Sequence, residues 1–175
     1  MKRYIIPIVL VLLCFGALSK CEKDDICSES TPTTPMMVID FYEYLNPSVR
    51  KSFLQLEVFD TENPENVLLF QSTNRILLPL KTSVDVSQYV FRLSYININQ
   101  TLTNEDLVEI RYTKDDIYIS RACGYKSNFT LSDSEPLNPN PKISDIAEDE
   151  FWVKEIIVRQ PVITNENETH LDILF

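Results

Sequence analysis

Glycine, histidine and long apolar runs are scarce in this sequence. Only Gly16 and Gly124 occur, so most turns must use Asn, Asp and Pro, which tolerate or preset turn geometry. A Ser-His-Asp triad would have to use His170, the only histidine, which we expect instead to be an ordinary surface residue. The apolar run at residues 4–18 is shorter than the roughly 20 residues that a membrane-spanning helix needs.

Basic residues are also few. The chain has 16 Lys and Arg against 26 Asp and Glu, a formal net charge of −10. Removing residues 1–20 would leave 13 basic and 26 acidic residues, a formal charge of −13. Such a surface repels nucleic-acid phosphates and anionic lipid head groups. We therefore expect no nucleic-acid partner, and a mature length that suits one domain.

The N-terminus has the organisation of a secretory signal. Lys2 and Arg3 precede the apolar residues 4–18, and the segment 18–20 (Leu-Ser-Lys) leads directly to Cys21. A charged start, a short apolar run and a break at a small-residue site are typical of a cleaved signal peptide. Cys21 stands where a bacterial lipoprotein carries its lipidated cysteine, so we predict a signal peptide at residues 1–20 and acyl chains such as palmitate on Cys21.

Lys20 leaves a second cleavage site open. Lipoprotein peptidases prefer Gly, Ala or Ser directly before the cysteine, and Lys20 departs from that pattern. The segment Ala17-Leu18-Ser19 fits ordinary signal peptidase, which would release a soluble protein beginning at Lys20. That product would keep three cysteines, an odd number for a secreted chain, so cysteine parity favours lipidation at Cys21.

The residues after Cys21 form a polar tether, predicted to span 21–35. Lys23, Asp24 and Asp25 resemble the export tag of surface lipoproteins in Bacteroidota, and they indicate exposure at the cell surface. The alternative is that these charges only keep the tether solvated.

Two cysteines remain for a disulfide bond. Cys14 leaves with the signal, and lipidation uses Cys21, so Cys27 and Cys123 are an even pair in an oxidising compartment. Their bond would close a loop of about 95 residues, for which chain entropy gives at most roughly 4–5 kcal/mol. Two free buried thiols are the alternative.

Residues 36–175 are predicted to form one all-β domain. Short runs alternate apolar and polar residues, as strands with one buried face do, and many such strands suggest an antiparallel β-sandwich. Asn104-Glu105 and Asp115-Asp116 are expected to separate strands. Only 46–52 and 144–151 could be helical. The predicted strands are 37–42, 54–58, 67–70, 76–80, 89–95, 108–112, 117–122, 128–131, 152–158 and 171–175.

One segment favours an immunoglobulin-like sandwich. Residues 85–91 have the form Asp-x-small-x-Tyr-x-apolar, which in such domains places a tyrosine at a strand-to-strand corner. The hydroxyl of Tyr89 is expected to bond to the upstream backbone. A plain strand after an Asp turn is the alternative.

The segment 121–126 is a candidate binding loop. Gly124 follows Cys123 directly and permits a left-handed backbone. Arg121, Gly124, Tyr125 and Lys126 are the candidate binding residues, since loops fixed on a scaffold often carry recognition. The alternative is a structural turn that lets Cys123 reach its partner.

No catalytic pattern is visible. The acids Asp145, Glu148, Asp149 and Glu150 are nearly consecutive, which is typical of a solvated face, whereas glycosidase chemistry needs two carboxylates across a cleft. We expect no enzyme activity, cofactor or metal, with a carboxylate-based hydrolase as the alternative.

Four segments together resemble a family of uncharacterised lipoproteins of flavobacteria and related Bacteroidota. They are 21–27 (CEKDDIC), 31–35 (TPTTP), 78–82 (LPLKT) and 122–126 (ACGYK). The resemblance implies a lipid anchor and the cysteine pair, and no activity. We therefore expect a lipoprotein anchored in the outer membrane, exposed at the surface, with a non-catalytic binding or structural role toward an envelope protein. The alternatives are the periplasmic face and secretion.

Overall fold

The computed structural model describes residues 26–98 and 100–175. These divide into two compact units. The smaller contains residues 26–32 and 118–125, and the larger contains 33–117 and 126–175. Every regular element is a strand, and within the described ranges no helix is long and apolar enough to cross a membrane.

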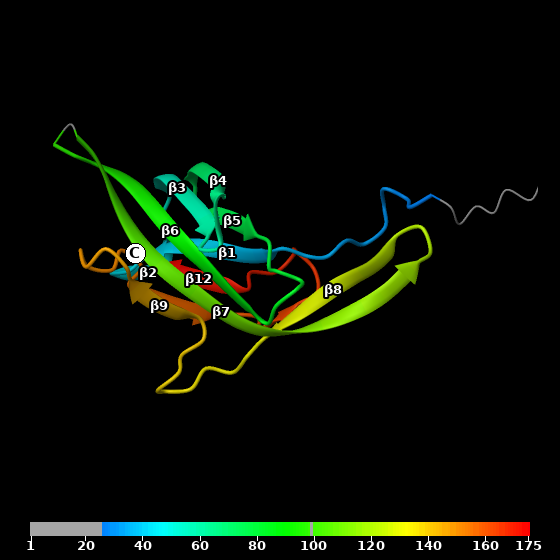
Figure 1. Cartoon of the computed structure of the whole chain (residues 1–175). Coiled ribbons are helices and arrows are strands. Elements are labelled where there is room, and N and C mark those ends of the chain that lie inside the picture. The colour runs from blue at the N-terminus through cyan, green and yellow to red at the C-terminus, as the bar shows by residue number, and fades with distance from the viewer. Residues whose placement is uncertain (1–25, 99) are drawn as a thin grey trace, which may run out of the picture. The chain divides into compact units, whose positions relative to one another are not determined.

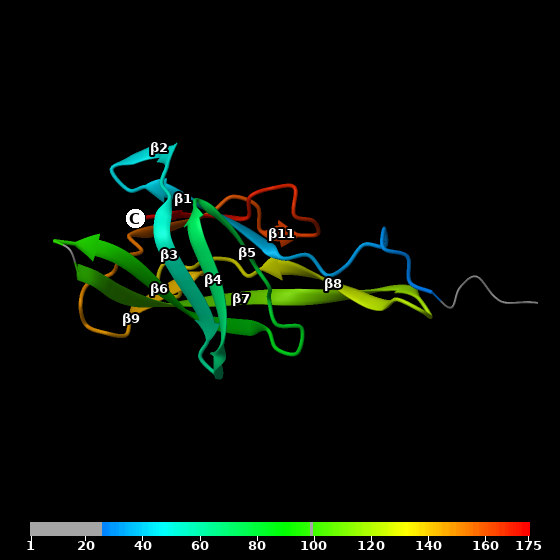
Figure 2. The ribbon, with the colours of Figure 1, turned by 90° about the horizontal axis from the view of Figure 1, so that it is seen from above.

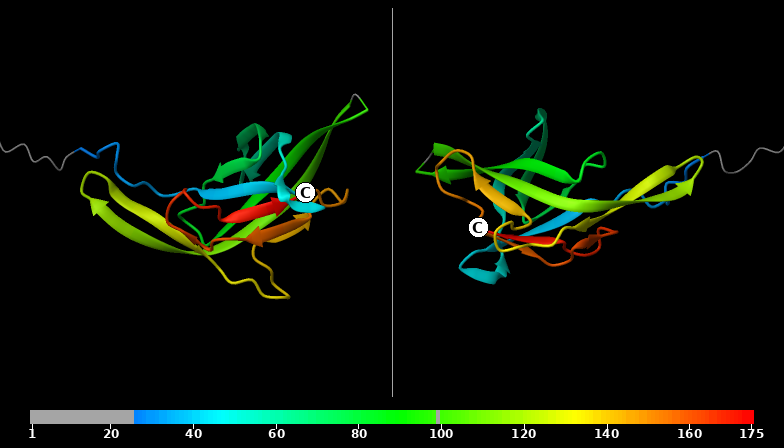
Figure 3. Two further views of the ribbon diagram at one scale, coloured as in Figure 1. Left: turned by 180° about the vertical axis from the view of Figure 1, so that it is seen from behind. Right: turned by 60° about the horizontal axis from the view of Figure 1, so that its bottom comes forward.

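The first sheet is built around the N-terminal and C-terminal strands. Its path runs β10-β12-β1-β2, and β5 pairs with β1 as well. β1 and β12 lie side by side and are parallel (Figure 3), and Ile39 is the register partner of Leu171. The strands are β1 (Met37–Glu43), β2 (Asn46–Arg50), β5 (Arg75–Leu78), β10 (Glu155–Val158) and β12 (Leu171–Leu174).

The second sheet is antiparallel and is ordered β11-β8-β7-β6-β3-β4, with β9 also paired to β7. β6 and β7 form its longest ribbon (Figure 1), and β3 and β4 lie side by side (Figure 2). The strands are β3 (Phe53–Asp60), β4 (Asn63–Thr73), β6 (Val86–Asn97), β7 (Gln100–Ser120), β8 (Gly124–Leu131), β9 (Lys142–Asp145) and β11 (Val162–Ile163).

The two sheets bury one apolar core between them. Phe41 of β1 meets Phe53 of β3 edge to face, with ring centroids 5.0 Å apart. Trp152 fills the core beside Phe175, and its indole N–H donates to the carbonyl of Phe91 at 2.9 Å. Side chains from both sheets therefore interlock, as in a β-sandwich. The predicted all-β sandwich is confirmed, with the parallel β1–β12 pair as its one departure from antiparallel order among the described pairings.

The tyrosine corner is also present. The hydroxyl of Tyr89 donates to the carbonyl oxygen of Pro79 at 2.5 Å, directly after β5 ends. A second tyrosine, Tyr112, donates to the carbonyl of Lys81 at 2.8 Å. Both phenols fasten the connection that carries the chain from the first sheet to the second.

Four local predictions are wrong. Residues 46–50 are strand β2 and 142–145 are strand β9, so neither predicted helical segment is helical. Asn104-Glu105 and Asp115-Asp116 do not separate strands, because both pairs lie inside β7. At Asn104-Glu105, pairing with β6 overrides the local turn preference of these residues.

Candidate functional site

The smaller unit is closed by a disulfide bond. Cys27 and Cys123 are joined, with their Cα atoms 5.0 Å apart, within the usual range for such bonds. The bond connects residues 96 positions apart in the sequence. The segment 26–32, part of the predicted tether 21–35, is therefore attached to the turn between β7 and β8.

The turn at 121–124 has the backbone that its glycine permits. Gly124 has a φ of 70°, a left-handed conformation that other residues rarely adopt. Apart from Gly124 and its two chain neighbours, no atom of the described residues lies within 4 Å of the position that a Cβ would take, so the backbone angle alone favours glycine. The amide of Cys123 donates to Ser120 Oγ at 3.0 Å, which fixes the approach to the disulfide.

Two tyrosines cover this turn from neighbouring strands. The rings of Tyr118 and Tyr125 meet edge to face, with centroids 5.3 Å apart. Both remain exposed, at 53% and 68% of the residue surface. Of the candidate loop residues, Arg121, Gly124 and Tyr125 lie in the smaller unit and Lys126 lies in the larger. Cys21, Lys23, Asp24 and Asp25 lie outside the described residues.

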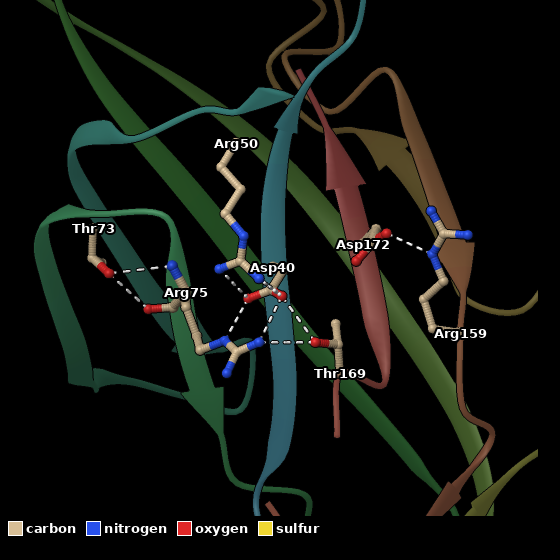
Figure 4. A network of polar contacts seen from close by, with 7 residues as sticks. All are labelled: Asp40, Arg50, Thr73, Arg75, Arg159, Thr169 and Asp172. Carbon is tan, nitrogen blue, oxygen red and sulfur yellow. Dashed lines mark hydrogen bonds and ion pairs between the residues drawn. The ribbon is translucent and has the colours of Figure 1, made fainter. Parts of the chain in front are cut away.

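In the larger unit, the best-organised polar cluster surrounds the buried carboxylate of Asp40 on β1 (Figure 4). Arg75 binds both carboxylate oxygens, at 2.5 and 2.7 Å, and Arg50 Nη2 approaches Oδ2 at 2.7 Å. Thr169 donates to the same Oδ2 at 2.9 Å. Burial alone would raise the pKa of Asp40, but hydrogen bonds from Arg75 and Thr169 and the charges of both arginines lower it.

A second buried carboxylate lies on the neighbouring strand. Asp172 of β12 is the register partner of Asp40, and Arg159 Nε donates to it at 2.6 Å. Three arginines thus neutralise two carboxylates on one sheet face, and this arrangement holds two like charges on adjacent strands. These residues were not among the site residues predicted from the sequence. The sequence feature that could have indicated them is an acid within an apolar strand. Asp40 follows Met37-Val38-Ile39, and Asp172 lies between Leu171 and Ile173.

The expectation of a surface histidine is wrong. His170 is 1% exposed, and its Nδ1 accepts the backbone N–H of Val38 at 2.8 Å. Burial lowers the pKa of His170, against the opposite effect of Glu168 and Glu166. The ring is neutral in this role, because only an unprotonated nitrogen can accept a hydrogen bond. His170 thus connects the start of β12 to β1.

The run of acids at 145–150 borders a pocket of about 690 Å³. Asp145 accepts the backbone N–H groups of Ala147, Glu148 and Glu150, so its carboxylate organises the loop. Glu148 and Glu150 have positive φ angles of 57° and 75°. The other lining residues are Ile143, Phe151, Val153 and Lys154.

Asp106 is a buried acid that also belongs to the larger unit. Its side chain is completely buried, Oδ2 accepts the N–H of Val153 at 2.8 Å, and Oδ1 has no hydrogen-bond partner among the residues that the structure describes. Burial raises the pKa of Asp106 to about 6, opposed by the N–H groups of Val153 and Trp152. Within the described ranges, no group of three His, Cys, Asp or Glu residues is placed to hold a metal ion.

These features define a mostly antiparallel β-sandwich protein with a disulfide-bonded hairpin turn and a buried network of carboxylates and arginines. The chain belongs to a family of unknown function, DUF6452, whose model matches residues 55–175. Comparisons with curated proteins and with solved structures found no match.

Proposed function

We propose that the protein is a lipoprotein of the outer membrane, anchored through Cys21, with a non-catalytic binding or structural role in the envelope. The signal-like residues 1–20, the position of Cys21 and the resemblance to lipoproteins of Bacteroidota support the anchor. The family match supports no particular activity.

The Cys27–Cys123 bond is the observation that carries this proposal. It removes both remaining cysteines of the mature chain from reaction and leaves Cys21 as the single thiol available for lipidation. Cys27 lies six positions after Cys21, so a lipid on Cys21 would hold Cys27 within about 20 Å of the membrane. A disulfide also requires an oxidising compartment, such as the periplasm or the cell surface.

Three polar groups that could serve catalysis already have structural partners. His170 Nδ1 accepts a backbone N–H, Asp40 is held by two arginines and Asp145 by three backbone N–H groups. General acid or base work needs a group that can exchange a proton with a substrate. This supports a binding or structural role.

The anchor can be tested by mass and by fractionation. We expect the intact mass of the wild-type protein from cells to include acyl chains, and Cys21→Ala to release the protein from membranes. Lys20→Gly is the matched control, because it restores a small residue before the cysteine and should leave lipidation unchanged or more complete. A mature N-terminus at Lys20 would contradict the proposal and favour a secreted binding module.

The alternative is a carboxylate-based hydrolase. Its active site would have to lie in the pocket at 145–150. Because Asp145 is occupied by the loop backbone, the reaction would depend on Glu148 and Glu150. We expect a deletion strain to be complemented by the Glu148→Gln/Glu150→Gln variant. Loss of complementation at normal protein abundance would favour the hydrolase.

A further inference from the structure

The smaller unit differs in charge from the rest of the chain. Its hairpin residues 118–125 contain one base, Arg121, and no acid, and its other described residues, 26–32, contain one acid, Glu29. The described part of the unit is therefore uncharged overall, whereas the mature chain has a formal charge of −13, from 13 basic and 26 acidic residues.

The same unit exposes aromatic and apolar side chains. Tyr118 and Tyr125 are 53% and 68% exposed, and Ile26, next to the disulfide, is 85% exposed. Tyrosine is enriched where a protein meets the membrane surface, because its ring is apolar and its hydroxyl stays hydrated. The edge-to-face contact of the two rings fixes them on adjacent strands and limits the side-chain entropy lost when they enter a lipid surface.

The disulfide places this unit next to the anchor. Cys27 belongs to the unit and lies six residues after Cys21, a distance of at most about 20 Å along the chain. A lipid on Cys21 would therefore keep Tyr118 and Tyr125 close to the head groups at a high effective concentration.

From these observations we propose that Tyr118 and Tyr125 form a membrane-docking surface that enters the head-group region beside the lipid anchor. This inference rests on the proposed anchoring at Cys21. The docking depends on the apolar and aromatic side chains rather than on charge, because the described residues of the unit are uncharged overall and the whole chain repels anionic surfaces. The surface would set the orientation of the protein on the bilayer.

Tryptophan substitutions can test the docking. The mature chain, residues 21–175, would be coupled through its Cys21 thiol to a maleimide lipid in phosphatidylcholine vesicles. The Tyr118→Trp and Tyr125→Trp variants should show blue-shifted emission on anchoring and lose intensity when the vesicles contain head-group-proximal doxyl lipids. Both effects should persist at high salt. Trp152 contributes little to the difference, since it is buried in the core of the larger unit.

Tyr95→Trp is the matched control, because Tyr95 is 41% exposed and lies on β6 in the larger unit. Its emission should not change on anchoring. Unquenched emission from both hairpin variants would overturn the inference, as would equal quenching of the Tyr95→Trp variant. Because the lipid is attached chemically, these outcomes are independent of lipidation in cells, which the mass of the cellular protein tests separately.

Discussion

Asp40 shows how a single residue organises one face of the first sheet. Its carboxylate is 1% exposed and is shared by two arginines that are themselves 44% and 43% exposed. A buried carboxylate needs such partners, because removing a charge from water without compensation is costly. The guanidinium of Arg50 also lies over the ring of Tyr42, 5.7 Å from its centroid, so the cluster combines neutralisation with packing.

We predict that Asp40→Asn lowers the free energy of unfolding by about 2–3 kcal/mol, less than for a fully buried pair because both arginines reach solvent. Asp172→Asn is the matched control and should cost less, since Asp172 binds a single arginine. The lowered pKa of Asp40 gives a stabilising contribution that is present above the unfolded pKa and is lost as pH falls through the folded value. Urea unfolding at pH 7 and at acidic pH measures both effects. Equal stability of wild type and Asp40→Asn at pH 7 would contradict the prediction.

Asp106 should make stability depend on pH in the direction opposite to that of Asp40. Its pKa is raised from 3.8 to about 6, so the folded protein binds this proton more tightly than the unfolded chain does. Stability from this group is therefore greatest in acid and is lost as pH rises through about 6. We predict that Asp106→Asn is more stable than wild type at pH 8, by on the order of 2–3 kcal/mol, because the amide stands in for the neutral acid.

The advantage of Asp106→Asn should shrink as pH falls from 8 to 5. The measurement is urea unfolding of wild type and variant across this range. A constant difference between the two proteins would show that Asp106 does not titrate in the folded state near pH 6. Glu109→Gln on the same strand is the control for the acid-to-amide change itself, because Glu109 is only partly buried.

The residue scale is also where sequence reasoning was weakest. Cys27, Cys123 and Gly124 were selected correctly as a group, because cysteine parity and a lone glycine are visible without knowledge of the fold. The burial of His170 was not visible, since it depends on the parallel pairing of β12 with β1 at the other end of the chain. His170→Ala would leave the N–H of Val38 without its acceptor, so destabilisation must be separated from loss of function in any test of that residue.

At the scale of elements, β7 shows why boundaries were harder to predict than strands. It runs from Gln100 to Ser120, although Asn104-Glu105 and Asp115-Asp116 were expected to interrupt it. Asn104 and Asp106 face the interior, where β6 and β9 pair with β7 on either side. Local sequence gives the alternation of a strand, whereas its length is decided by partners far away in the chain.

The disulfide is an element-scale prediction, because it joins the β7–β8 turn to the segment before β1. We predict that Cys27→Ser and Cys123→Ser each lower the free energy of unfolding by a similar amount, about 2–4 kcal/mol. The double variant should cost little more than either single one, since both remove the same bond. Unfolding curves of the three variants, with non-reducing peptide mapping of the wild type, measure this. Maleimide-reactive thiols at both positions in the purified wild type would contradict it.

For the whole molecule, the sandwich followed from the many short alternating runs, and the Tyr89 corner indicated where the chain changes sheets. The parallel contact of β1 with β12 did not follow, because alternation specifies which face of a strand is buried and not which strand lies beside it. The arginine network depends on that contact, as Asp40 and Asp172 come from these two strands. The fold class was thus predictable, whereas the residues that the pairing of β1 with β12 brings together were not.

In the proposed lipoprotein, the side of the membrane that the protein reaches would depend on the short segment between Cys21 and the disulfide. Lys23, Asp24 and Asp25 lie between Cys21 and Cys27, the segment that would separate the acyl chains from the folded unit. If these residues are an export tag, the protein faces the outside of the cell. We predict that protease added to intact cells degrades the wild-type protein. The variant with alanine at positions 23, 24 and 25 should stay lipidated and be protected.

A second triplet supplies the control for this experiment. Alanine at positions 28, 29 and 30 also removes three exposed polar residues, but on the far side of Cys27 from the anchor. This variant should remain accessible to protease. An export tag is recognised by its position directly after the lipidated cysteine, whereas the general polarity of the tether does not depend on position. Protection of both variants would indicate that export needs only a solvated tether. Protection of neither, with the wild type degraded, would show that Lys23, Asp24 and Asp25 have no part in reaching the surface.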